Sequence, residues 1–486
     1  MRVAVIGAGP AGLTAALQLS RGGASVDVYE AGSQVGGLAR SFDLWGRRVD
    51  LGPHRFFSTD ARVNQFWKNI VGSDYVMVER LTRIHFKGKL FQYPLRPLDV
   101  FSKLGFAETS LTLLSYAKQW LHLGLRETGL PSFETWVVRR FGQRLYETFF
   151  KTYSEKLWGI PCTELSEDFA AQRIRKLTLH DAISNALLRP KKSEHRTLAD
   201  CFAYPLGGTG TVYERIASQI VALGGQVHLA HAIDEVLSED GRVTGVRSTD
   251  GPVVAYDHVI STMPLTLLTK AMSNVPQSVH DAADKLAFRN TLLVYLEVEG
   301  TNLFEDQWLY IHDRAVRVGR VTNFNNWGIT DPTSKTSILC CEFWCNHTDP
   351  AWTASDNELA EQANSELRKT GLIKDQRICN SHVVRIPRCY PIYRIGYRQH
   401  VDVLSEFLQS IAGLTVIGRY GSFKYNNQDH SILMGLLAAD NVLHAQHHNL
   451  WDLNSDFESY QERSLITQTG IMRTQSSQEM EPCSRR

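Results

Sequence analysis

The sequence has little that would commit it to a nucleic acid or a membrane. Its 52 basic and 51 acidic residues leave a formal net charge of +1, so no overall field favours a polyanionic partner or an acidic membrane surface. No uninterrupted apolar stretch is long enough to cross a bilayer, and the best candidate, residues 100–124, is broken by Lys103, Glu108 and Lys118. We therefore expect a cytoplasmic protein without nucleic-acid or membrane partners, in which local arginines must hold any anionic ligand.

The cysteines do not occur in the patterns that are typical of metal sites or of a disulfide framework. The eight cysteines form no CxxC pair, and nothing in so large a chain suggests a disulfide framework. Cys340, Cys341 and Cys345 could be ligands of a metal ion, but reduced thiols in a partly buried strand are the commoner arrangement. We therefore predict no metal site.

The rest of the composition is that of a globular protein with more than one domain. Hydrophobic residues make up 43% and charged residues 21% of the 486 residues, and a chain of this length exceeds the size at which a single core stops growing. The sequence contains no internal repeat. The first residues, MRVAVIGAGPAGLTAALQL, superficially resemble a signal peptide, but they lack basic residues beyond Arg2 and are better explained as strand, turn and helix.

The N-terminal thirty residues have the spacing of a dinucleotide-binding unit. Residues 3–6 are all apolar, as in a buried parallel strand, and Gly7, Gly9 and Gly12 follow in the pattern GxGxxG. In that pattern the first glycine permits a tight turn, the second lets a pyrophosphate approach the backbone, and the third brings the helix close to the strand. The helix, residues 13–21, would present its N-terminal amides to the phosphates.

A second strand and a terminal acid complete this unit. Residues 25–29 form the strand, and Glu30 stands at its end, where a carboxylate can accept hydrogen bonds from ribose hydroxyls. A bare GxGxxG is weak evidence, but strand, glycines, helix, strand and acid in this order strongly indicate a bound dinucleotide. This unit alone fits either NAD or FAD.

Three later segments distinguish the two cofactors. They are AGSQVGGLARSF, with Gly36, Gly37 and Arg40, then GGQVHLAHAIDEV, with Val236, and VTGVRSTDGPVVAYDHVISTMP, a hairpin and a strand that ends near Thr262. They resemble, in this order, segments of the FAD family that contains amine oxidases, protoporphyrinogen oxidases and UDP-galactopyranose mutases. The resemblance implies FAD, with the glycine pair close to the flavin phosphates, Val236 against adenine and the last strand delivering Thr262 to the cofactor.

Polar side chains crowd residues 418–435, GRYGSFKYNNQDHSILMG, directly before an apolar helix. The segment resembles the GGR segment of UDP-galactopyranose mutase, which implies that Arg419 neutralises the flavin pyrophosphate and that Asp429 meets the ribityl and pyrimidine atoms. A buried flavin needs such partners because each unpaired polar atom is costly. The resemblance assigns these residues to FAD: Gly7, Gly9, Pro10, Ala11, Gly12, Glu30, Gly36, Gly37, Leu38, Ala39, Arg40, Pro53, His54, Val236, Thr262, Arg419, Gln428, Asp429 and Ser431.

Four further stretches are DLGPHRFFSTD, GKLFQYPL, LYETFFKTYSEKLWGIPCTELSEDFAAQRI and YPLGGTGTVYERI. They are similar to segments of UDP-galactopyranose mutases, so that the resemblance covers most of residues 1–445. It places His54 near the flavin ring and Arg173 on an arginine that contacts the substrate diphosphate, and it implies that both are catalytic. The substrate residues that it implies are Tyr153, Trp158, Arg289, Arg388, Tyr390 and Tyr425.

The chain also departs from the mutase pattern. Mutases have a second diphosphate arginine in a TRIIE motif, and the corresponding region here, VTNFNNWGITDP and SILCCEFWCNHTDPAW, has no arginine at that place. Arg289 is a candidate match for another mutase arginine, and Arg385 or Arg388 could substitute for the missing one. The segments NFNNWG, RIPRCYPIY and YNNQDHS resemble a less characterised branch, labelled protoporphyrinogen-oxidase-like and associated with sugar or polysaccharide pathways.

These assignments predict an α/β fold. A discontinuous Rossmann-like FAD-binding domain would carry a mixed β-sheet substrate domain and an inserted, mostly helical substrate domain, and a polar C-terminal remainder would be a disordered tail. The predicted boundaries are 1–60, 200–265 and 405–462 for the FAD-binding domain, 61–199 for the helical domain, 266–404 for the mixed sheet and 463–486 for the tail.

Three functions stay open on the sequence. The resemblance first implies a mutase that acts on a nucleoside-diphosphate sugar, in which reduced flavin N5 forms a glycosyl adduct and the sugar ring reopens and recloses, with a reductant such as NAD(P)H. The second is an FAD-dependent oxidase or dehydrogenase of the protoporphyrinogen oxidase or amine oxidase type, acting on a sugar or a natural-product intermediate. The third is a binding protein like the Rab escort proteins, against which the intact glycines argue. Each is compatible with a homodimer.

Overall fold

The computed structural model describes residues 1–121, 131–168, 201–249, 251–329, 333–453, 464–467 and 470–473. The chain divides into two compact units, each assembled from separate stretches of sequence. Unit 1 comprises Met1–Val78, Cys201–Ala287 and Tyr397–Arg486, and unit 2 comprises Glu79–Asp200 and Phe288–Gly396. Unit 2 thus combines the inserted helical segment with the mixed sheet, which the sequence analysis treated as separate domains.

Unit 1 is built on a five-stranded parallel sheet in the order β19-β13-β1-β2-β9. Its central strand is apolar on both faces, and Val3 and Val5 are fully buried, as in a sheet covered on both sides. Helix α1 (Pro10–Arg21) begins three residues before the predicted start, because the fixed φ of Pro10 suits the first turn of a helix. The strands are β1 (Arg2–Ile6), β2 (Ser25–Tyr29), β9 (Gln226–His228), β13 (His258–Ser261) and β19 (Leu414–Val416).

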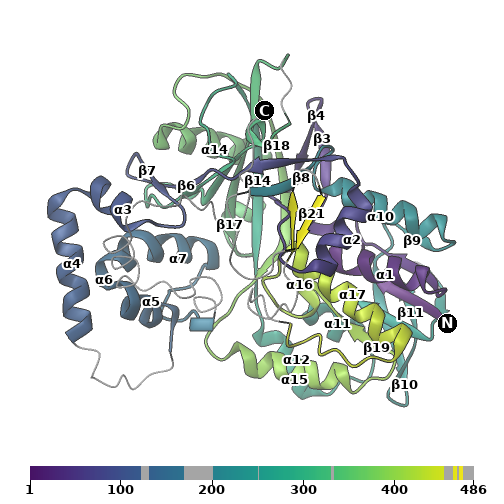
Figure 1. The fold of residues 1–486 in the computed structure, drawn as a ribbon. Helices are drawn as coiled ribbons and strands as arrows, with labels where there is room; N and C mark the ends of the chain where they lie inside the picture. The colour runs from purple at the N-terminus through teal and green to yellow at the C-terminus, as the bar shows by residue number, and fades with distance from the viewer. Residues whose placement is uncertain are drawn as a thin grey trace. The chain divides into compact units, whose positions relative to one another are not determined.

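Helix α1 packs closely on α17 (Gln428–His444), a helix more than four hundred residues later in the chain (Figure 1). A Cβ atom on Gly435 would lie 2.5 Å from the carbonyl oxygen of Ala11, so only glycine allows this approach. The close contact brings the C-terminal polar segment beside the N-terminal glycine loop.

Smaller elements surround this sheet. A three-stranded antiparallel sheet, β10-β11-β12, contains the predicted hairpin, although Asp250 of its turn lies outside the described residues. The bounds are β3 (Ser41–Leu44), β4 (Arg47–Asp50), α2 (Ala61–Val71), β5 (Tyr75–Glu79), β8 (Cys201–Pro205), α10 (Gly210–Ala222), β10 (Ile233–Glu239), β11 (Arg242–Ser248), β12 (Val253–Ala255), α11 (Leu265–Ala271), α12 (Gln277–Lys285), α15 (Tyr397–Gln409) and α16 (Gly418–Gly421).

One part of the predicted disordered tail is ordered. Strands β20 (Ser464–Thr467) and β21 (Gly470–Arg473) pair antiparallel, and the Tyr75 hydroxyl donates a hydrogen bond to the carbonyl oxygen of Thr467 at 2.5 Å. The sequence analysis had assigned these residues to the tail because the segment is polar. The segment instead pairs apolar residues across two short strands, Leu465 with Met472 among them.

Unit 2 is built on a seven-stranded mixed sheet in the order β18-β14-β17-β16-β15-β6-β7. Helix α14 (Asp356–Thr370) packs against β14 and β18. Cys340, Cys341 and Cys345 are buried in β17, and the described residues contain no cluster of metal-ligating side chains. The strands are β6 (Thr82–Phe86), β7 (Lys89–Gln92), β14 (Phe288–Glu299), β15 (Trp308–Ile311), β16 (Arg320–Asn323), β17 (Thr336–Cys345) and β18 (Ile378–Pro391).

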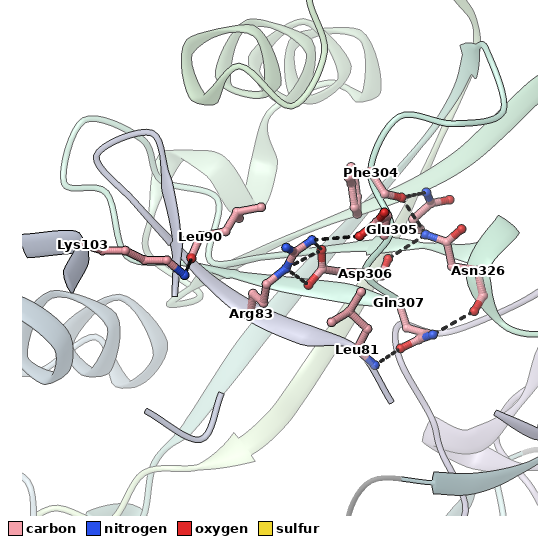
Figure 2. Close-up of polar contacts among 10 residues, drawn as sticks. Leu81, Arg83, Leu90, Lys103, Phe304, Glu305, Asp306, Gln307 and Asn326 are labelled. Carbon is pink, nitrogen blue, oxygen red and sulfur yellow. Dashed lines mark hydrogen bonds and ion pairs between the residues drawn. The ribbon is translucent and has the colours of Figure 1, made fainter. Parts of the chain in front are cut away.

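A buried ion pair joins the two distant stretches of sequence in unit 2. Arg83 of β6 donates from Nε and Nη2 to the fully buried carboxylate of Asp306, with a shortest distance of 2.6 Å (Figure 2). The neighbouring Gln307 accepts a hydrogen bond from the amide of Leu81 at 2.7 Å. The hairpin β6–β7 is therefore an edge of the mixed sheet, which is why the inserted segment does not form a separate domain.

The helices of unit 2 include a π-helical turn, Tyr146–Lys151, that runs directly into α7 (Thr152–Trp158). This continuous helix carries the YSEKLWG motif and ends at Gly159, whose φ of +67° favours glycine. The other helices are α3 (Pro97–Leu104), α4 (Phe106–Leu121), α5 (Phe133–Phe141), α6 (Gln143–Leu145) and α13 (Pro350–Thr353).

Candidate cofactor and substrate sites

The first glycine loop is fixed by contacts that no other residue type would allow. Gly7 has φ of +99°, and a Cβ atom on it would lie 2.1 Å from the Thr262 hydroxyl. That hydroxyl donates to the carbonyl oxygen of Ile6 at 2.9 Å. A Cβ atom on Gly12 would lie 2.0 Å from the carbonyl oxygen of Gly7. The structure thus brings the predicted cofactor residues Gly7, Gly12 and Thr262 together.

Glu30 ties the end of β2 to this loop. Its carboxylate accepts hydrogen bonds from the amides of Ala8 and Gly32, each at 2.8 Å. Because two carboxylate oxygens offer about four acceptor sites, both oxygens keep capacity for ribose hydroxyls. The predicted role of Glu30 is therefore compatible with the bonds that hold it.

The second glycine pair lies directly on the first loop. The amide of Gly36 donates to the carbonyl oxygen of Ala8 at 2.8 Å, and a Cβ atom on Gly37 would lie 3.1 Å from the Cα atom of Gly9. Gly36 has φ of +101°, so the turn requires glycine. The residues that follow, Leu38, Ala39 and Arg40, complete a short 3₁₀ turn and its exit.

The C-terminal polar segment meets the same place. A Cβ atom on Gly418 would lie 3.3 Å from the Cβ atom of Ala11 and 3.5 Å from that of Thr262. The guanidinium of Arg419 lies over the ring of Tyr425, with Cζ 4.4 Å from the centroid, and donates to the carbonyl oxygen of Asn426 at 3.0 Å. These contacts hold the Arg419 guanidinium beside the start of α17.

Gln428 connects the start of α17 to the loop that carries His54. It accepts a hydrogen bond from the Tyr213 hydroxyl at 2.8 Å and donates to the carbonyl oxygen of Arg55 at 3.0 Å. The His54 ring lies 2.8 Å from the carbonyl oxygen of Leu51 through Nε2. The structure therefore places His54 and Gln428 together, both held by backbone carbonyls.

The remaining predicted cofactor residues differ in what surrounds them. Asp429 is buried, with its carboxylate 3.1 Å from Nδ1 of His430, whereas the Ser431 hydroxyl donates to its own helix at Asn427. Pro53 immediately precedes His54 in the loop. The Val236 side chain is fully buried in the three-stranded sheet. In the segment after β9, the backbone amide of His231 donates a hydrogen bond to the backbone carbonyl oxygen of Glu30 at 2.9 Å.

The glycine cradle supplies a test of whether unit 1 fits FAD. The loop of Gly9 and the loop of Gly37 lie so close together that a Cβ atom on Gly37 would be 3.1 Å from the Cα atom of Gly9. Since neither glycine has a side chain, the backbone there is open to a pyrophosphate. Nearby, Oδ1 of Asn426 is buried without a hydrogen-bond partner among the described residues, an acceptor that a bound polar ligand could satisfy. The residues present fit a flavin dinucleotide.

The sequence analysis missed a buried polar network beside His54. Asp50, fully buried at the end of β4, accepts hydrogen bonds from the hydroxyls of Ser41 and Tyr204 and from the amide of Thr209, and the Thr209 hydroxyl donates to the His54 carbonyl oxygen at 2.6 Å. The signal was present in YPLGGTG, since a Cβ atom on Gly208 would lie 2.6 Å from the Ser41 hydroxyl oxygen. Through the Thr209 hydroxyl, this network holds the backbone of His54 in place.

The network predicts a pH dependence of stability. Burial raises the pKa of Asp50 from 3.8 to about 6, against the opposing effect of its hydrogen bonds. Since the folded state binds the proton more tightly, Asp50 favours folding most at low pH and loses about 2 kcal/mol of that contribution between pH 4 and pH 6. The Asp50→Asn variant should lack this pH dependence. The free energy of unfolding of the variant minus that of the wild type should therefore rise between pH 4 and pH 6. Above pH 7 this difference should stay level. Denaturant titrations of both proteins check it, and a flat difference would contradict it.

The predicted substrate residues of unit 2 form aromatic contacts. Trp158 is fully buried and stacks on Tyr393, with ring centroids 5.9 Å apart, and meets Tyr390 edge-on at 6.2 Å. Tyr153 stacks on the buried His312 at 4.7 Å. Unit 2 thus brings Trp158 and Tyr390 together and holds Tyr153 by a residue that the sequence analysis missed.

The predicted arginines have different surroundings. Arg289 is buried in unit 2, whereas Arg388 has a positive φ of +54° and its amide donates to the Asn290 side chain at 2.9 Å. Arg385 is already engaged by Asp356 at 2.6 Å. Arg173 lies outside the described residues.

A further arginine, Arg320 on β16, was not singled out from the sequence. It donates through Nε and Nη2 to the buried carboxylate of Glu342 at 2.5 and 2.6 Å, and Nη2 lies 3.5 Å from the hydroxyl of Tyr390. The register of β16 on β17 pairs Arg320 with Glu342. This ion pair therefore appears only in the folded sheet.

Comparison with known proteins agrees with this geometry. A model of flavin-containing amine oxidoreductases matches residues 10–443. The chain belongs to this family. It is therefore an FAD-dependent enzyme, as the sequence analysis predicted.

Members of the family differ in what they do. A probable UDP-galactopyranose mutase of Klebsiella pneumoniae is 28% identical over 174 residues, 34% of this chain and 42% of that protein. A phytoene desaturase (neurosporene-forming) of Rhodobacter capsulatus is 26% identical over 281 residues, 54% of this chain and 52% of that protein. The chain thus spans about half or less of the length of these curated relatives.

The α/β flavoenzyme fold is confirmed by a solved structure. A reduced UDP-galactopyranose mutase superimposes with a TM-score of 0.78 and 24% sequence identity, over 92% of this chain and 94% of that one. Among the described residues, no helix is long and apolar enough to cross a membrane.

Proposed function

We propose that this family member is a mutase-like enzyme that isomerises the sugar ring of a nucleoside-diphosphate sugar without net redox. The observation that carries the proposal is the pairing of two features in one chain. Unit 1 has an FAD cradle of four converging segments, and unit 2 retains the YSEKLWG helix with Trp158 against Tyr390. The likeness of this chain to a mutase of Klebsiella pneumoniae supports it.

The residues divide the work by their chemistry. Bound FAD in its reduced form would supply the nucleophilic nitrogen for such a reaction, with a reductant such as NAD(P)H as the source of electrons. Arg173 and Arg289 would bind the diphosphate, because guanidinium groups hold phosphate oxygens in pairs. His54 would keep its loop at the flavin through the bonds to Leu51 and Thr209.

A specific observation favours a second candidate, an FAD-dependent oxidoreductase acting on a sugar or natural-product intermediate. Strand β17, TSILCCEFWC, contains no arginine, and the neighbouring Arg320 is neutralised by Glu342. A second diphosphate charge at this place would therefore be missing. The desaturase relative belongs to this kind of enzyme by its name.

Anaerobic turnover distinguishes the two. With a panel of UDP-, GDP- and dTDP-sugars, we expect ring isomerisation only after dithionite reduction, with a rate at least about 100-fold above that of the oxidised enzyme, because oxidised flavin lacks the electron pair that the reaction needs. Product is measured by chromatography. Substrate-dependent release of hydrogen peroxide in air, with no isomerised sugar under dithionite, would replace the mutase by the oxidoreductase.

A further inference from the structure

Helix α4 packs on unit 2 through a polar face. Its neighbours α3, α5 and α6 all lie on one side of it in Figure 1. The guanidinium of Arg144, in α6, donates to the Glu108 carboxylate at 2.9 Å, and the Arg144 amide donates to the Ser115 hydroxyl at 3.3 Å. Thr112, one turn after Glu108, is only 2% exposed. Since residues 108, 112 and 115 recur at helical spacing, they define the inner face of α4.

The helix lies close to the rest of unit 2 along this inner face. A Cβ atom on Gly142, between α5 and α6, would lie 3.1 Å from the Cα atom of Tyr116. The hydroxyl of Thr112 donates to the carbonyl oxygen of Glu108 at 2.7 Å, so it is satisfied within the helix. The orientation of α4 is therefore fixed by ordinary packing and hydrogen bonds.

The opposite face of α4, called here the outer face, is apolar and points away from these contacts. Its five large side chains are 40–90% exposed. They are Phe106, Leu111, Leu113, Leu114 and Leu121. A surface helix normally turns its apolar stripe to the core and its polar face to water. Helix α4 has the reverse orientation, which is typical of a surface that another body covers.

The elements around the outer face carry an excess of positive charge. Residues 89–121 and 133–145, which include β7 and α3 to α6, contain seven basic and three acidic residues, 7 − 3 = +4. The acids of α3 and α4 are both paired, Asp99 with Lys103 and Glu108 with Arg144. Lys118 is exposed and lies one turn after Leu114, so its amine borders the outer face.

The size of the outer face favours a lipid surface over a protein partner. A stable protein interface covers about 800 Å² on each partner. Helix α4 has 16 residues, so its outer face is about 24 Å long and about 10 Å wide. An amphipathic helix on a bilayer needs no larger area, because it binds by burying one apolar face at the boundary of headgroups and acyl chains. Basic residues beside that face add attraction to anionic headgroups.

We propose that the outer face of α4 docks this protein on a lipid surface with anionic headgroups. Phe106 and the leucines would enter the acyl region, while Lys118 would extend its amine to the headgroup phosphates. The sequence analysis expected no membrane partner, because the net charge of the whole chain is +1 and no segment is long enough to span a bilayer. Docking through one helix face requires neither. The proposal concerns attachment and does not depend on the reaction at the flavin.

Co-sedimentation of the flavin-loaded protein with vesicles tests the docking surface. With vesicles of equal parts phosphatidylcholine and phosphatidylserine, we expect saturable binding. Leu114→Ser should weaken it about tenfold, Phe106→Ser by a similar factor, and the double variant about 100-fold. Because both side chains are exposed, the variants should keep the melting temperature of the wild type. The matched control Leu223→Ser, at a leucine that is 50% exposed at the end of α10, should bind like the wild type.

Several results would overturn the proposal. Absence of wild-type binding to these vesicles, equal weakening by Leu223→Ser, or equally tight binding to vesicles of phosphatidylcholine alone would each refute an anionic lipid surface. Light scattering without lipid examines the other occupant. A wild-type dimer that Leu114→Ser dissociates, together with absence of vesicle binding, would assign the outer face to a second copy of the chain instead.

Discussion

Replacing Gly9 by valine is expected to give a folded protein that no longer holds FAD. Gly9 has ordinary extended dihedrals, φ −82° and ψ −177°, which valine adopts readily. A Cβ atom there would have only the Cα atom of Gly37 within 4.0 Å, so the fold tolerates it. The added methyl groups would nevertheless fill the place where a pyrophosphate approaches the backbone. We expect the affinity for FAD to fall at least about 100-fold. The flavin content is measured as the ratio of absorbance at the flavin band to the absorbance of the protein.

The controls separate loss of cofactor from loss of fold. Ala31→Val, at the exposed residue directly after Glu30, should keep both flavin and stability. Gly12→Val should lose both, because its Cβ would collide with the Gly7 carbonyl oxygen at 2.0 Å. A Gly9→Val protein that purifies yellow with normal flavin content would refute the position of the cofactor in the glycine cradle.

Replacing Glu342 by alanine is expected to destabilise the protein by about 3–5 kcal/mol, because it leaves the guanidinium of Arg320 buried without a counter-charge. The Glu342 side chain is 2% exposed and that of Arg320 is 16% exposed. Denaturant titration measures the loss.

The double variant Arg320→Met, Glu342→Leu is the control for that prediction. It removes both charges and keeps most of the volume, so it should recover most of the lost stability. A single variant as stable as the wild type would show that the pair contributes little. Because Arg320 also lies 3.5 Å from the Tyr390 hydroxyl, the double variant additionally tests whether the pair positions Tyr390 for substrate.

The FAD cofactor could be predicted from the sequence because the signals that indicate it are local. A backbone position with positive φ favours glycine whatever its tertiary surroundings, so the sequence itself indicates such positions, as at Gly7 and Gly36. Helix α14 is likewise marked by local signals, a capping box of Ser355 with Glu358 at its start and Gly371 at its end. The roles predicted for the individual site residues, Val236 and Ser431 among them, depend on distant contacts and stay predictions.

The sequence by itself determined the family, the cofactor and the order of strand, glycine turn and helix, because these depend on neighbours in the chain. Only the tertiary structure decided which charges meet. The pairing of Arg320 with Glu342 follows from the register of two strands, and the hydrogen bond that holds His54 comes from Thr209, a residue 155 positions away. Electrostatic interactions act through space rather than along the chain, so their partners appear only when the chain is folded.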